Sequence, residues 1–210
     1  MATKILIADD HAIVRQGLVQ ILSDYPDMVV ENEAGDGGEV MDLVKEKDFD
    51  IVVLDLNMPG GGLDILKQLK LLKPKLPVLV LSYYPEEQYA TRVLKAGASG
   101  YINKLSATDE MIAAIRKIST GGTYLSPKIM DKLALEIIDK EEKPVHETLS
   151  DREYQVMLLI GSGKTPTEIA EELSLSVKTV STYRSRILSK MKLKNSSQIM
   201  NYAMKHDLVE

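Results

Sequence analysis

The sequence predicts an α/β fold with a doubly wound, five-stranded parallel sheet, followed by a second, smaller all-α domain. Two observations lead to this prediction. Over residues 4–119, short apolar runs alternate five times with segments that repeat apolar residues every three or four positions. Such alternation is typical of a parallel sheet with helices on both faces. From residue 148 onward the strand pattern disappears and only helical patterns remain.

The predicted strands are short and almost wholly apolar, as expected where both faces of a parallel sheet are covered. They are 4–8, 28–34, 50–54, 77–81 and 99–102. The segments between them have the period of amphipathic helices. These are 11–23, 37–46, 62–72, 86–96 and 106–119. We therefore expect a first domain over 1–122, a helix and charged linker over 123–147, and a second domain over 148–210.

Composition excludes several classes of protein. The chain has 210 residues and no cysteine, which excludes disulfides, thiolate metal sites and cysteine nucleophiles. No apolar run approaches the roughly 18 residues that a membrane span needs. The first residues lead directly into a strand, without the pattern of a signal peptide. We expect a cytoplasmic protein with no membrane partner.

The second domain has the pattern of a helix-turn-helix. Two capping boxes, Ser150 to Glu153 and Thr165 to Glu168, begin its first two helices. The second helix is short, a turn follows at 174–176, and a longer basic helix covers 177–191. Asn195 caps a fourth helix. A short helix, a tight turn and a longer helix describe a helix-turn-helix.

Charge separates the two parts of the chain. Residues 1–125 carry a net charge of -5, whereas residues 148–210 carry +2. Six basic residues and no acidic residue lie between 176 and 194. They are Lys178, Arg184, Arg186, Lys190, Lys192 and Lys194. This balance favours a polyanionic partner for the second domain, although a solvated helix face would look similar.

The basic helix has two distinct faces at 100° per residue. Val180, Ile187 and Met191 share one face, which we expect to be buried. The opposite face is small and polar with cations at its edge, which suits a helix in a major groove. It carries Lys178, Thr182, Ser185 and Ser189, with Arg186 beside them. Arg184 lies near the apolar face, where it is either structural or reaches a phosphate from the flank.

Polar residues mark four strand ends in the first domain. Asp9 and Asp10 end the first strand, Asp55 the third, Ser82 the fourth and Lys104 the fifth. Each alone is weak evidence, because an Asp after a strand usually caps a helix. The carboxyl ends of parallel strands meet at one edge, so these side chains converge. Converging carboxylates repel unless a cation offsets their charge, and Mg²⁺ prefers oxygen ligands. The set therefore indicates phosphoryl chemistry with Mg²⁺.

With these residues in place, 3–120 resembles a CheY-like receiver domain. The resemblance rests on Asp9-Asp10, on Asp55 within Asp-Leu-Asn-Met-Pro-Gly, on Ser82 and on Gly-Tyr-Ile-Asn-Lys104. It implies the strand order 2-1-3-4-5 and a phosphoacceptor, Asp55, that a sensor histidine kinase phosphorylates.

The same resemblance implies roles for the other residues. Asp10, Asp55 and the main-chain carbonyl of Asn57 would bind Mg²⁺, with Asp9 assisting through water. Lys104 would contact the phosphoryl group, and Ser82 and Tyr101 would form the switch pair. The alternative for Tyr101 is a strand aromatic that packs on the last helix.

Two positions depart from the family pattern: the loop after Asp55 and the residue after Lys104. The segment Pro59-Gly-Gly-Gly-Leu-Asp64 is one residue shorter than usual, so we expect the loop 60–62 to close differently. Many receivers place proline, in a cis bond, after the lysine. Here Leu105 follows Lys104, and we expect a trans bond because a cis bond costs about 2.5–4 kcal/mol without proline.

The tail, 148–208, resembles the NarL/FixJ (LuxR-type) DNA-binding domain, and most closely its GacA/UvrY branch. The carriers are the two capping boxes, Ser-Val-Lys-Thr-Val180 and Ile187-Leu-Ser-Lys-Met-Lys-Leu193. The resemblance implies that the third helix enters the groove and that the fourth, with Asn195, Tyr202 and Met204, forms a homodimer. The implied DNA contacts are Lys178, Thr179, Ser181, Thr182, Ser185, Arg186, Ser189, Lys190 and Lys192. A helix that binds a protein partner is the alternative.

The sequence as a whole predicts a phosphorylation-dependent, DNA-binding response regulator of a two-component system, and not an enzyme. Two alternatives stay open. One is a receiver whose output is regulated without phosphate. The other is a phosphatase with an aspartate nucleophile, but such enzymes need Asp-x-Asp at the first strand end, where this chain has Asp9-Asp10-His11.

Overall fold

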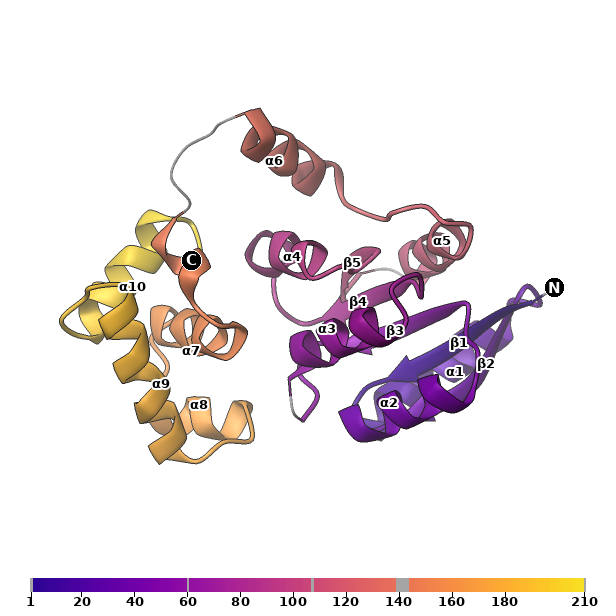
Figure 1. Cartoon of the computed structure of the whole chain (residues 1–210), viewed down its shortest axis with the longest axis horizontal. Coiled ribbons are helices and arrows are strands. Elements are labelled where there is room, and N and C mark those ends of the chain that lie inside the picture. Colours follow the sequence, from indigo (N-terminus) through magenta and orange to yellow (C-terminus); the bar gives the residue numbers. More distant parts are fainter. Residues whose placement is uncertain (1, 60, 107, 139–143, 210) are drawn as a thin grey trace. The chain divides into compact units, whose positions relative to one another are not determined.

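The computed structural model contains an α/β unit and a helical unit, Met1–Ile138 and Asp139–Glu210 (Figure 1). It describes residues 2–59, 61–106, 108–138 and 144–209. Gly60, in the loop with the predicted departure, and most of the predicted charged linker (139–143) lie outside the described residues. The helix that we grouped with the linker, α6 (Pro127–Ile138), is counted in the first unit.

The first unit is built on a five-stranded parallel sheet in the order β2-β1-β3-β4-β5, which confirms the predicted fold class. The strands are β1 (Thr3–Ala8), β2 (Met28–Ala34), β3 (Ile51–Asp55), β4 (Val78–Ser82) and β5 (Gly100–Asn103). All residues of β3 and β4 are buried, which explains their unbroken apolar runs.

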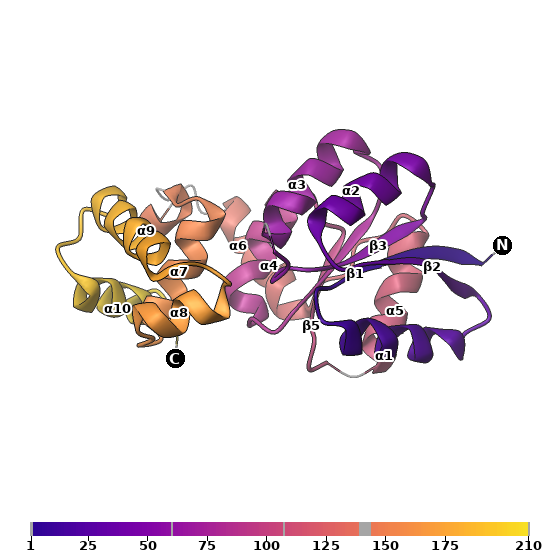
Figure 2. The same cartoon turned by 90° about the horizontal axis from the view of Figure 1, so that it is seen from below.

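Five helices connect and cover these strands. They are α1 (Ala12–Ser23), α2 (Gly37–Glu46), α3 (Gly62–Leu72), α4 (Glu86–Lys95) and α5 (Thr108–Ser119). Figure 2 shows α2 and α3 on one face of the sheet and α1 and α5 on the other. Tyr124, beyond α5, forms an isolated parallel bridge with Gly100 at the sheet edge.

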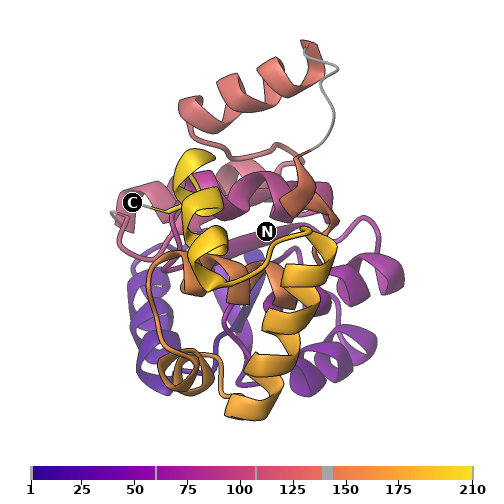
Figure 3. The same cartoon turned by 90° about the vertical axis from the view of Figure 1, so that its left-hand side faces the viewer.

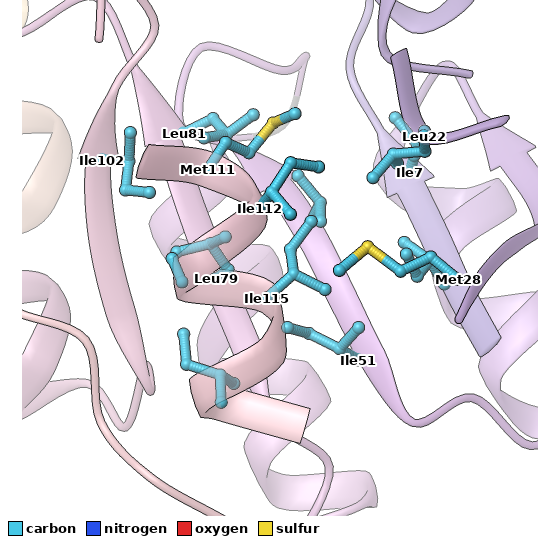
Figure 4. Close-up of a cluster of buried hydrophobic side chains, with 14 residues drawn as sticks. Ile7, Leu22, Met28, Ile51, Leu79, Leu81, Ile102, Met111, Ile112 and Ile115 are labelled. Atoms are coloured by element: carbon cyan, nitrogen blue, oxygen red, sulfur yellow. The ribbon is translucent and has the colours of Figure 1, made fainter. Parts of the chain in front are cut away.

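The core on the α1 and α5 side of the sheet contains side chains from all five strands and from both helices (Figure 4). Ile7 and Ile51 from the sheet meet Ile112 and Ile115 from α5, and all four are at most 3% exposed. Burial of such side chains stabilises the fold by about 1.5–3 kcal/mol each. This packing holds the carboxyl ends of β1 and β3 in fixed positions.

Over residues 144–209, the second unit has four α-helices that cross one another, preceded by a short 3-10 turn (Figure 3). The elements are η1 (Val145–Thr148), α7 (Asp151–Gly161), α8 (Pro166–Glu172), α9 (Val177–Lys190) and α10 (Ser196–Lys205). Ser150 and Thr165 form the two predicted capping boxes, and Asn195 caps α10. η1 spans the predicted boundary between the linker and the second domain, and in it His146 Nδ1 is 3.0 Å from the hydroxyl of Tyr202 in α10.

Across the described residues, no helix has both the length and the apolar character that a membrane crossing requires.

Candidate functional site

The carboxyl ends of β1 and β3 bring three predicted aspartates together. Asp9 and Asp10 follow β1, and Asp55 is the last residue of β3. One ligand atom from each of them, and one from His11, all lie within 4.8 Å of one another. Asp9 and Asp55 are 1% and 2% exposed, whereas Asp10 and His11 are exposed. The register of β1 and β3, which pairs Ala8 with Leu54, produces this meeting.

Lys104 lies between the two buried carboxylates. Its ammonium nitrogen is 2.5 Å from Asp9 Oδ2 and 2.9 Å from Asp55 Oδ2. Burial alone would lower the pKa of Lys104, but the ion pairs with Asp55 and Asp9 outweigh burial and raise it. The Lys104–Leu105 bond is not cis, as the missing proline predicts.

The two carboxylate oxygens of Asp55 have different partners. Oδ1 accepts from the Asn57 backbone N–H at 3.1 Å. Oδ2 is buried, and its close partner among the described residues is the Lys104 ammonium, with which it forms an ion pair at 2.9 Å. Burial raises the pKa of the Asp55 carboxyl, more than Lys104 lowers it. An oxygen with an unused lone pair suits a cation or an electrophile.

The predicted switch residues lie on the two neighbouring strands. The register pairs Asp55 with Leu81, so Ser82 is one residue beyond the level of Asp55. Ser82 is fully buried, and its Oγ accepts from the Tyr84 N–H at 3.1 Å. Tyr101 is 1% exposed, and its hydroxyl donates to the Tyr84 carbonyl at 2.7 Å. Burial raises the pKa of Tyr101, so its hydroxyl stays protonated and remains a donor.

The short loop after Asp55 closes against the strand end. Gly61 has φ 91°, and Gly62, the first residue of α3, donates its N–H to the Leu56 carbonyl at 3.0 Å. A Cβ on Gly62 would lie 2.3 Å from the Asp55 carbonyl oxygen and 2.5 Å from Leu56 Cα. The helix therefore begins at the predicted residue, but only glycine fits there.

His11 is a site residue that the sequence reasoning missed. Its Nδ1 lies 2.7 Å from Asp10 Oδ1, and its backbone N–H donates to Asp9 Oδ1 at 2.9 Å. Its position directly after Asp9-Asp10, as the N-cap of α1, was the available indication.

The basic helix α9 has the two predicted faces. Val180, Ile187 and Met191 are buried. Of the nine predicted DNA contacts, Thr179 is half-buried and the other eight are exposed. Arg184 donates to Ser196 Oγ at 2.8 Å, which ties α9 to the start of α10 and favours the structural reading. The ammonium of Lys190 lies 2.6 Å from Glu153 of α7.

Comparison with known proteins assigns both units. The family model of the response regulator receiver domain matches residues 5–116, and that of bacterial regulatory proteins of the luxR family matches residues 147–203. The chain belongs to the LuxR-type response regulators. Over 99% of both chains, the regulator is 36% identical to the oxygen regulatory protein NreC of Staphylococcus carnosus. It is 35% identical to the response regulator GacA of Pseudomonas aeruginosa, over 99% of this chain and 98% of GacA.

Solved structures support the same assignment over nearly the full length. The regulator is similar to RcsB of Salmonella enterica serovar Typhimurium, bound to the promoter rprA in the presence of the phosphomimetic BeF3-. The TM-score is 0.63 and the identity 25%, over 95% of this chain and 98% of RcsB. The family thus agrees with the sequence resemblance in both halves, and GacA, the branch that the tail resembles, is among the relatives.

Proposed function

We propose that Asp55 is the phosphoacceptor of this regulator and that a sensor histidine kinase is the donor. The observation that carries the proposal is the Asp55 carboxylate itself, whose Oδ2 is buried beside the Lys104 ammonium, with two further aspartates close by. An Asp55 oxygen forms a bond to phosphorus while the phosphorus–nitrogen bond of a phosphohistidine breaks, and the imidazole nitrogen takes up a proton. Lys104 offsets charge on the phosphoryl oxygens, and Ser82 contacts one of them.

Mg²⁺ is the proposed cofactor of this transfer. The donor set fits a hard cation, because it consists of carboxylates with an unused buried oxygen. Asp10, Asp55 and the main-chain carbonyl of Asn57 would hold the ion, with Asp9 assisting through water. When bound, the ion offsets negative charge on the transferring group. Tyr101, with Ser82, forms the proposed switch pair.

The output that we propose is DNA binding by a homodimer in the cytoplasm, with 148–210 as the DNA-binding domain, 1–122 as the receiver and 123–147 as the connection. The exposed face of α9 enters a major groove, and two subunits read half-sites related by twofold symmetry. RcsB, which is 25% identical to this chain, has been solved bound to a promoter, and this complex supports the proposal. The contacts proposed are Lys178, Thr179, Ser181, Thr182, Ser185, Arg186, Ser189 and Lys192.

Labelling by a small phosphodonor such as acetyl phosphate tests the phosphoacceptor. Asp55→Asn should abolish the label, because an amide cannot form the acyl phosphate. Asp42→Asn is the matched control, since the exposed Asp42 side chain pairs with Lys45 and should leave labelling unchanged. Full labelling of Asp55→Asn would overturn the proposal. Continued release of phosphate from phosphate esters would instead favour a phosphatase, and we propose that the chain is not an enzyme.

A further inference from the structure

Glu153 is a buried carboxylate in the second unit that the acidic site does not include. It is the third residue of α7, and its side chain is 3% exposed. It completes a capping box, in which its Oε2 accepts from the Ser150 N–H at 2.8 Å. Capping does not require burial, because Glu168 fills the same position in the capping box of α8 and is exposed. A buried carboxylate needs a further partner to offset its charge.

Lys190, in the last turn of α9, supplies that partner. Its ammonium nitrogen lies 2.6 Å from the same Oε2 that accepts from Ser150. Burial acts to raise the pKa of Glu153, but the hydrogen bonds from Lys190 and Ser150 outweigh it and lower the pKa. The carboxylate therefore joins two helix ends that are 37 positions apart in the sequence: the start of α7 and the end of α9.

The other cations at the edge of the exposed face of α9 differ from Lys190. In the described part of the chain, no carboxylate pairs with Lys178, Arg186 or Lys192, so their charges are available to a polyanion. Moving Lys190 to a DNA phosphate would leave Glu153 buried and unpaired. The Lys190 side chain is 43% exposed but that of Glu153 is 3% exposed, so losing the ammonium leaves a buried carboxylate without its cation, which is unfavourable.

We propose that Lys190 is a positioning residue, whose ammonium holds the end of α9 on Glu153 and does not contact DNA. The proposal rests on the proposed DNA-binding function and divides the basic residues of α9 into two groups. Lys178, near the start of the helix, contacts phosphate. Lys190 fixes the angle at which α9 leaves the body of the domain.

Lysine acetylation, read by mass spectrometry on the wild-type protein, tests this division. The probe is double-stranded DNA of random sequence, because non-specific binding depends almost wholly on phosphate contacts. We expect Lys178 to react readily in the free protein and to be protected by DNA. Lys190 should react slowly in both states, with an unchanged rate. Protection of Lys190 by DNA to the extent seen for Lys178 would overturn the proposal.

Salt dependence of the affinity for the same DNA gives a second test. Lys190→Met should weaken binding about tenfold while the slope of log K against log salt stays that of the wild type. Lys178→Met should reduce the magnitude of the slope by about 0.9, the value for one phosphate contact. A reduction of about 0.9 in Lys190→Met would contradict the positioning role.

Glu153→Gln separates positioning from charge. Removing an anion near DNA should tighten binding if electrostatics alone decides, whereas loss of the tie should weaken it. We expect weaker binding, and a double variant Glu153→Gln/Lys190→Met that is no weaker than either single variant. Tighter binding by Glu153→Gln would overturn the proposal.

Chemical unfolding without DNA keeps this inference separate from the proposed function. The losses in free energy of unfolding caused by Glu153→Gln and Lys190→Met should be less than additive, whether or not the chain binds DNA. Strictly additive losses would contradict the interaction between Glu153 and Lys190. A protein that shows the coupling but binds no DNA would contradict the proposed function instead.

Discussion

At the scale of single residues, the acidic site depends on how one cation is shared. Lys104 pairs with both Asp9 and Asp55, and these three side chains are almost wholly buried. The ammonium keeps two carboxylates close together that would otherwise repel each other. It also stands where a phosphoryl group on Asp55 would place its charged oxygens.

Lys104→Met should therefore slow labelling by acetyl phosphate without abolishing it. Loss of one group that stabilises developing charge typically costs about 10²–10³ in rate. The rate of label incorporation measures the effect. Lys45→Met is the control, because Lys45 is exposed and its ion-pair partner is the exposed Asp42. Equal rates for Lys104→Met and the wild type would show that the cation has no part in the transfer.

The lowered pKa of Glu153 predicts a pH dependence of stability. Because its folded pKa lies below the ordinary value, ionised Glu153 stabilises the fold above about pH 4.3, and this contribution is lost as pH falls through the lowered folded pKa. The difference in free energy of unfolding between the wild type and Glu153→Gln should be constant near neutral pH and shrink under acid. Urea unfolding at a series of pH values measures it. A difference that grows with acid would show the opposite sign of the pKa shift.

At the scale of elements, the start of α3 and the end of β3 form one packed junction. Gly62 carries no side chain because the Asp55 carbonyl and the Leu56 backbone fill the space where Cβ would be. Backbone atoms cannot move aside as a flexible side chain can. The short loop therefore sets where Asp55, the proposed phosphoacceptor, lies relative to α3.

Gly62→Ala should both destabilise the first unit and impair labelling of Asp55. Forcing a methyl group into a packed site costs about 2 kcal/mol, and the strand end must move to accept it. Thermal unfolding and acetyl phosphate labelling measure the two effects. Gly17→Ala, in α1, is the control, because nothing lies within 4 Å of the added Cβ. It should stabilise the protein by about 0.5–1 kcal/mol; a neutral Gly62→Ala would refute the close packing.

At the scale of the whole molecule, phosphorylation has to alter the DNA affinity of a different unit. A population shift does this if the phosphorylated receiver favours the state that binds DNA, with a coupling of about tenfold or more. Six basic residues and no acidic residue lie between 176 and 194, which favours a polyanionic partner for the second unit.

Beryllium fluoride, which mimics the phosphoryl group, should raise both the DNA affinity and the dimer fraction of the wild type. Asp55→Asn should respond in neither measurement, because the mimic needs the carboxylate. Fluorescence anisotropy with labelled DNA and sedimentation velocity provide the two readouts. A wild-type protein that binds DNA equally with and without the mimic would favour regulation without phosphate.

Much of the fold could be predicted because local sequence patterns decide it. Apolar runs defined β3 and β4, and side chains at fixed offsets, such as Ser150 with Glu153, defined the helix starts. The candidate site was predictable for a related reason. Parallel strands bring their carboxyl ends to one edge, so Asp9, Asp55 and Lys104 converge wherever their strands pair.

The remaining features depend on contacts between distant segments, which no local pattern specifies. Lys190 looked equivalent to Lys178 on the helix, and only the packing of α7 against α9 places Glu153 beside it. The loop 60–62 was expected to close differently, but only the structure shows that Gly62 packs against the backbone of Asp55 and Leu56. The sequence by itself determined the order of the elements, the two units and the chemistry at the strand ends, since these follow from local periodicity and parallel pairing. Only the tertiary structure decided which charges are paired and which glycine has no room, because those depend on how side chains from separate elements fill the same space.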